Sequence, residues 1–69
     1  MPSQCNLNNA KFFLNDVATT DNLLAVRNAA GVTKHRLEVP DGMYNLRTDA
    51  DRIRVLVNEK NEIIELICG

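Results

Sequence analysis

Serine, histidine and glycine are scarce in this chain, and their scarcity argues against several classes of enzyme. Ser3 is the only serine and stands near the N-terminus, which argues against a Ser-His-Asp arrangement. His35 is the only histidine, and beside Arg36 on an expected strand it is typical of a half-exposed sheet residue. The three glycines lie far apart in sequence, so no loop of the phosphate-binding kind is present. The sequence therefore predicts a non-enzyme.

Other absences bear on cofactors and partners. One histidine, two distant cysteines and scattered carboxylates form no metal-ligand pattern, so we expect neither a metal nor another cofactor. The net charge is −1, the basic residues are dispersed, and there is one tyrosine and no tryptophan, which argues against nucleic-acid binding. No apolar run approaches the roughly 20 residues that span a bilayer. Hydrophobic residues make up 45% and charged residues 25% of the chain, as in ordinary globular domains.

The two cysteines stand at opposite ends of a chain of 69 residues that we expect to form one domain, 1–69. If Cys5 and Cys68 pair, nearly the whole chain lies in one loop, and the chain-entropy model gives about 4 kcal/mol of stabilisation. A core of this size supplies only about 3–5 kcal/mol, so pairing would matter. The alternative is two unrelated buried thiols.

A disulfide would indicate an oxidising compartment, and we expect a secreted or periplasmic protein. Residues 1–4 contain neither the basic nor the apolar region of a signal peptide. The chain is thus either not exported, or a mature form from which the signal has been removed.

The order of hydrophobic patterns and turn signals predicts an α+β fold with a small sheet. Asn6 is a candidate N-cap for the first helix, and Thr19 or Thr20 for the second, which Gly31 would end. Asn15 can take the left-handed conformation that ends the first helix. The expected helices are 6–14 and about 20–30, and the expected strands are 32–39, 51–58 and 62–68.

Between the first two expected strands, the apolar residues of segment 43–50 follow neither the spacing of a helix nor that of a strand. Pro40-Asp41-Gly42 is a turn signal that opens this long segment. Alternation then places Arg52 and Arg54 on one face of their strand, opposite the apolar face. Two neighbouring guanidiniums can donate hydrogen bonds to the carbonyls of an extended segment and stiffen it. The other interpretation is a solvated face without a partner.

The second half of the chain also resembles a known family. Residues 45–57 (NLRTDADRIRVLV) follow, without a gap, a pattern in which a loop of the form T-M-E-Y precedes D-R-V-R or S-R-L-N and a strand. That pattern is typical of the potato inhibitor I family. Residues 58–64, the terminal Cys68-Gly69 and the position of Cys5 are more similar still to the microbial elastase and subtilisin inhibitors of this type, which have one terminal disulfide.

The resemblance implies a sheet packed on one main helix, with a long exposed binding loop that inhibits a serine protease as a substrate mimic. By register Leu46 is the P1 residue, and Arg52 and Arg54 support the loop. An apolar P1 residue suits subtilisin-, elastase- or chymotrypsin-like proteases, and we expect a monomer. The reactive loop would comprise Met43, Tyr44, Asn45, Leu46, Arg47 and Thr48 within 43–49.

Arg47 departs from the family, which usually has glutamate at that position to interact with the supporting arginines. Asp49 or Asp51 could offset its charge. A shifted register would make Arg47 the P1 residue and indicate a trypsin-like target. The same departure favours the alternative hypothesis, a non-inhibitory protein-interaction module on the same scaffold.

Overall fold

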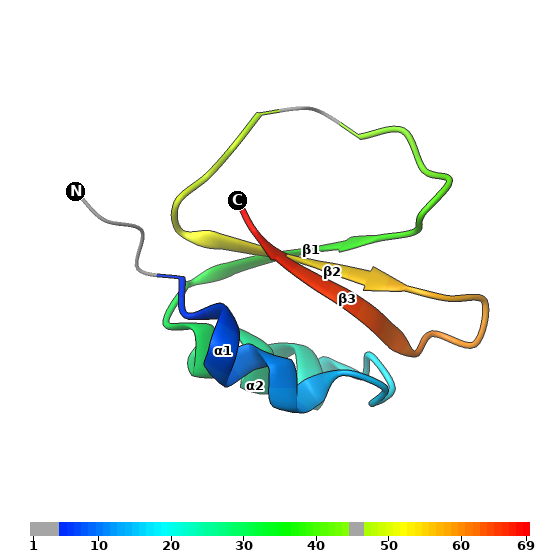
Figure 1. Ribbon diagram of the computed structural model, residues 1–69, viewed down its shortest axis with the longest axis horizontal. Helices are drawn as coiled ribbons and strands as arrows, with labels where there is room; N and C mark the ends of the chain where they lie inside the picture. Colours follow the sequence, from blue (N-terminus) through cyan, green and yellow to red (C-terminus); the bar gives the residue numbers. More distant parts are fainter. Residues whose placement is uncertain (1–4, 45–46) are drawn as a thin grey trace.

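Two helical segments precede a three-stranded sheet in the computed structural model, which describes residues 5–44 and 47–69 (Figure 1). The order of elements agrees with the sequence-based expectation of a small α+β fold. None of the helices in these two ranges has the length and apolar character needed to cross a bilayer. The elements are α1 (Leu7–Ala10), the 3-10 helix η1 (Lys11–Phe13), α2 (Thr20–Ala30), β1 (Lys34–Glu38), β2 (Arg52–Val57) and β3 (Ile63–Cys68).

The helix ends follow the predicted caps. The side chain of Asn6 accepts a hydrogen bond from the Asn9 amide, and that of Thr19 accepts one from the Asn22 amide. Gly31 ends α2 with a φ of 75°, a left-handed conformation in which glycine has no Cβ to strain. The two N-caps and the helix-ending glycine can thus be predicted from neighbouring residues alone.

The first helix is shorter than predicted, because the segment 6–14 divides into α1 and η1. Asn15 adopts a φ of 74°, and its amide donates to the carbonyl of Ile63 on β3 at 2.7 Å. The amide of Ile63 donates in turn to the carbonyl of Asp16 at 2.8 Å. The Asn15 amide and the Asp16 carbonyl thus bond to β3 and are not available to continue the helix.

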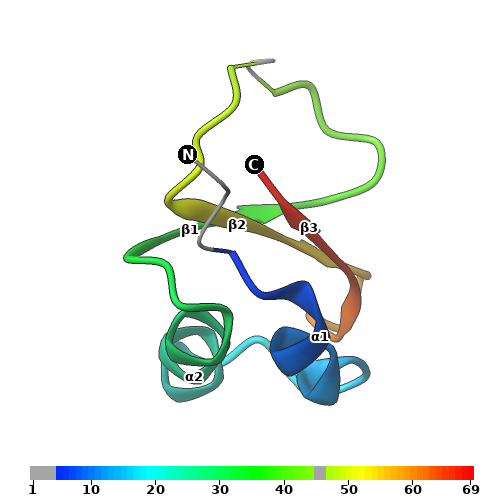
Figure 2. The same ribbon diagram turned by 60° about the vertical axis from the view of Figure 1, so that its left-hand side comes forward.

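β2 is the central strand of the sheet, parallel to β1 and antiparallel to β3. A tight turn joins β2 to β3, but the parallel pair needs a connection that returns along the full length of the strands. The chain makes that return as a wide arch, whose described residues, 39–44 and 47–51, lie over one face of the sheet, while the helices lie on the other face (Figures 1 and 2). The sheet thus separates the helices from the arch.

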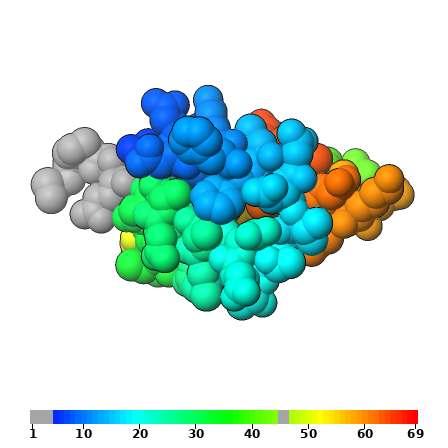
Figure 3. All heavy atoms as spheres, turned by 90° about the horizontal axis from the view of Figure 1, so that it is seen from below, coloured from blue at the N-terminus to red at the C-terminus, as the bar shows by residue number. Residues whose placement is uncertain are grey.

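The core lies between the sheet and the helices. Ile53, Val55 and Val57 alternate along β2 and are buried, as their spacing predicted. Seen from the helix side, α1, η1 and α2 cover most of the sheet (Figure 3). The remaining buried hydrophobic residues include Ala10, Leu23, Val26, Ala30, Val32, Ile63 and Leu66. The opposite face of β2 is left to its arginines and to the arch.

Cys5 and Cys68 form a disulfide that ties the segment before α1 to the end of β3, as the sequence predicted. Their Cα atoms are 5.9 Å apart, and Cys5 packs against the buried core. The disulfide encloses the arch and all the helices and strands that the structure describes. A chain cut anywhere in the arch would therefore remain one covalent molecule.

Removing the disulfide should cost stability because it closes nearly the whole chain into one loop. We expect the Cys5→Ala/Cys68→Ala double variant to lose about 2–5 kcal/mol of unfolding free energy in urea denaturation. The parent protein under reducing conditions is the matched control and should lose a similar amount. Equal stability of oxidised parent and double variant would contradict this account.

Candidate functional site

The arch between β1 and β2 is the segment of the sequence to which all the predicted reactive-loop residues belong. It opens with the predicted turn, in which the Gly42 amide donates to the carbonyl of Val39 at 3.0 Å. Met43 is 99% exposed, and Arg47 and Thr48 are also exposed. The predicted P1 residue Leu46 and its neighbour Asn45 lie outside the described residues.

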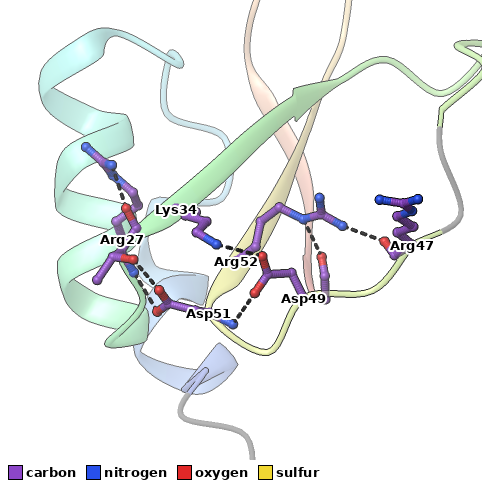
Figure 4. Close-up of polar contacts among 8 residues, drawn as sticks. Arg27, Lys34, Arg47, Asp49, Asp51 and Arg52 are labelled. Atoms are coloured by element: carbon purple, nitrogen blue, oxygen red, sulfur yellow. Dashed lines mark hydrogen bonds and ion pairs between the residues drawn. The ribbon is translucent and has the colours of Figure 1, made fainter.

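Arg52 connects the arch to the end of the chain (Figure 4). Its Nε donates to the carbonyl of Gly69 at 2.9 Å, and its Nη2 donates to the carbonyl of Arg47 at 2.7 Å. The Gly69 amide completes the link by donating to the Arg52 carbonyl at 2.9 Å. The planar guanidinium thus reaches two carbonyls at once, which a lysine could not do in this geometry.

Arg54 faces the same side of β2 but forms its ion pair with β1. Its Nη1 lies 3.9 Å from the Oε1 of Glu38, whose other carboxylate oxygen accepts from the Nε of Arg36 at 2.5 Å. Glu38 is only 5% exposed, so its charge is held by these two arginines. The sequence-based expectation that Arg54 binds the loop directly remains a proposal, because part of the loop is outside the described residues.

The second leg of the arch, residues 47–51, leads into β2 and is fixed by two aspartates (Figure 4). Asp49 accepts from the ammonium of Lys34 at 2.9 Å, and Asp51 accepts from the amide of Thr33 at 2.9 Å and from its hydroxyl. The hydrogen bond from Lys34 is the main cause that lowers the pKa of Asp49, and the bond from Thr33 hydroxyl does the same for the pKa of Asp51. The two residues expected to offset Arg47 thus bind the first residue of β1 and the residue before it.

The first leg of the arch, residues 39–44, leaves β1 and is held by contacts of Tyr44. These contacts were not predicted from the sequence. The Tyr44 hydroxyl accepts from the Val39 amide at 2.7 Å, and the guanidinium of Arg36 lies 5.4 Å from the centre of the Tyr44 ring. An aromatic residue two positions after a Pro-Asp-Gly turn was the available signal. The partner on β1 could not be read from that signal.

The remaining titratable groups offer little chemistry for catalysis. Nδ1 of His35 is buried and has no hydrogen-bond partner among the described residues. Burial, and secondarily the charge of Arg27, lowers the pKa of His35 and favours its neutral form. Within residues 5–44 and 47–69 there is no group of three or more side chains suited to a metal ion. What the arrangement can do is hold an exposed peptide segment in a fixed shape.

An open groove lies beside the arch, between its first leg and the turn from β2 to β3. Val39, Pro40 and Ile64 provide apolar lining, and Asp41 and Lys60 are among its charged residues. The groove contains none of the predicted site residues. The candidate functional site is therefore the arch itself.

A solved structure shares this fold over its whole length. The elastase inhibitor AFUEI, in crystal form II, superimposes with a TM-score of 0.70 and is 30% identical, with 100% of both chains covered. The chain belongs to the family of this elastase inhibitor. No protein-family model matches it, and no curated protein does. The likeness shows a protease-inhibitor fold, whereas the potato inhibitor I assignment rests on the sequence resemblance alone.

In this inhibitor scaffold the second leg of the arch should weaken in acid. A carboxyl whose pKa is lowered by folding adds stability above its ordinary value, 3.8 here, and loses it as pH falls through the folded value. We expect the unfolding free energy to fall below about pH 4, and to fall less in Asp51→Asn, which cannot be protonated. Urea denaturation of both proteins from pH 2 to 7 measures this. Parallel curves would show that Asp51 contributes no acid sensitivity.

Proposed function

We propose that this protein inhibits a serine protease by offering the arch as a substrate mimic. The reactive loop would comprise residues 43–49, with Leu46 as the P1 residue and Arg52 and Arg54 as supports. Leu46 would enter an apolar specificity pocket of a subtilisin-, elastase- or chymotrypsin-like protease. A secreted monomer is the simplest form of such an inhibitor, and the disulfide is compatible with an extracellular location.

The observation that best supports this proposal is the double hydrogen bond of Arg52. It holds the backbone of Arg47, the residue after the proposed P1 residue, to the carbonyl of Gly69 at the end of β3. A loop fixed before it meets a protease loses less conformational entropy on binding than a free peptide would. The 30% identity to an elastase inhibitor over both full chains agrees with this use of the loop.

The contacts on the C-terminal side of the scissile bond would also slow release after cleavage. Asp49 binds Lys34 of β1, Asp51 binds Thr33 just before β1, and Arg52 binds Arg47, so the new N-terminus would be held near the sheet. The disulfide joins the two pieces because it spans the cut. After cleavage of the loop, both ends of the broken bond would thus remain close to the protease.

Leu46 should carry a large share of the binding energy. Burying a leucine side chain is worth about 1.5–3 kcal/mol, so Leu46→Gly should raise the inhibition constant for an apolar-pocket protease at least about tenfold. Leu46→Asp should raise it further, because an unpaired charge would enter the pocket. Arg47→Ala is the comparison variant and should have a smaller effect. Inhibition constants against subtilisin, elastase, chymotrypsin and trypsin measure all three.

The same panel separates the alternatives. If Arg47→Ala abolishes inhibition of trypsin while Leu46→Gly is mild, the register is shifted by one residue. Mass spectrometry of slowly cleaved protein should show a cut after residue 46, and a cut outside 43–49 would remove the loop assignment. A parent protein that inhibits none of the four enzymes would favour the non-inhibitory interaction module.

Arg52→Ala should loosen the loop because it removes both carbonyl contacts. Two hydrogen bonds of about 0.5–1.5 kcal/mol each predict inhibition weaker by about 5- to 150-fold, together with faster cleavage by the protease. Arg52→Lys keeps the positive charge but lacks the planar guanidinium that reaches two carbonyls, so it should recover only part of the loss. Equal inhibition by all three proteins would show that Arg52 does not support the loop.

A further inference from the structure

We infer that Tyr44 is a positioning residue that holds the first leg of the reactive loop in its binding shape by folding back onto the turn before it. This inference rests on the proposed inhibitory function and adds a second set of contacts that hold the loop. Arg52 acts on the residue after the proposed P1 residue. Tyr44 acts before that residue, on the opposite leg of the arch.

The turn at the start of the arch is built to receive the tyrosine ring. A Cβ at Gly42 would overlap the ring and hydroxyl of Tyr44, and the three heavy atoms nearest to that point all belong to Tyr44. The backbone of Gly42 is not left-handed, so the closest overlap of an alanine there would be with the ring and not a strained φ. Glycine therefore provides the space that Tyr44 occupies.

The hydroxyl and the ring of Tyr44 are both engaged. The hydroxyl accepts from the Val39 amide, while the Val39 carbonyl accepts from the amide of Gly42. The turn and the tyrosine thus share the same anchor residue at the end of β1. The guanidinium of Arg36 lies over the ring, a cation–π contact that joins the leg to the sheet.

Arg36 is itself held in place by the charges of the arch-facing side of the sheet. Arg36 and Arg54 are direct neighbours across β1 and β2, where like charges repel. The buried carboxylate of Glu38 lies between them and offsets that repulsion. A line of contacts therefore runs from the central strand through Arg54, Glu38 and Arg36 to Tyr44.

The contact can be measured in the free protein, without any protease. Tyr44 is the only tyrosine and there is no tryptophan, so tyrosine fluorescence anisotropy reports on this ring alone. We expect Gly42→Ala to lower the anisotropy by displacing the ring. Amide exchange at Val39, followed by NMR, should become about two- to tenfold faster in Tyr44→Phe, which lacks the hydroxyl acceptor. Unchanged anisotropy and exchange would overturn the inference.

A double-mutant cycle tests the effect on inhibition. Gly42→Ala should weaken inhibition of the protease found for the parent by about two- to tenfold, with little change in urea stability. In a Tyr44→Ala background the same Gly42→Ala substitution should have no further effect, because the ring it displaces is gone. Phe12→Ala is the matched control, since Phe12 is an aromatic residue exposed on the helix side of the molecule.

The outcomes separate the two proposals. Additive effects of the two substitutions would mean that each residue contacts the protease directly, and would overturn the positioning role. A parent protein that inhibits no protease would overturn the proposed function, and the exchange and anisotropy results would still decide whether Tyr44 holds the turn. Non-additive inhibition together with faster exchange at Val39 would support both.

Discussion

The parallel pairing of β1 with β2 is the constraint on which the rest of this structure depends. An antiparallel neighbour can be reached by a tight turn, as β3 is reached from β2, but a parallel neighbour requires a return over the length of the strand. In most proteins that return is a helix packed on the sheet. Here the helices precede the sheet and already cover one face, so the return is an exposed arch over the other (Figure 2).

An exposed arch has no core of its own, and its shape must therefore come from polar contacts with the sheet beneath it. The arch-facing side of β1 and β2 bears Lys34, Arg36, Arg52 and Arg54, together with the buried Glu38. Each leg uses part of this set. The leg that enters β2 is bound through Arg52 and Lys34, and the leg that leaves β1 is bound through Arg36.

This division of the molecule explains how a small domain can hold both ends of an exposed arch. The apolar face of the sheet, the two helices and the disulfide supply stability, while the charged face supplies shape to the arch. Substitutions in the arch can then alter recognition with little effect on the core. The likeness to an elastase inhibitor fits the proposed function, in which a loop fixed before binding would lose less conformational entropy.

The sequence by itself determined the features that depend on neighbouring residues or on period. The caps at Asn6 and Thr19, the helix end at Gly31 and the alternation along β2 are of this kind, because each arises within a few residues. The pairing of Cys5 with Cys68 was also predictable, since two cysteines allow only one intramolecular disulfide. The resemblance of residues 45–57 to known inhibitors predicted the reactive loop and its supporting arginines, and these stay predictions.

Only the tertiary structure decided which groups meet across the sheet. The register of β1 against β2 places Arg36 opposite Arg54, buries Glu38 between them, and brings the guanidinium of Arg36 against the ring of Tyr44. Strand period specifies which face a residue takes but not its neighbour on the next strand. The partners of Asp49 and Asp51 were unpredictable for the same reason, because Lys34 and Thr33 approach them only when the arch closes the parallel pair.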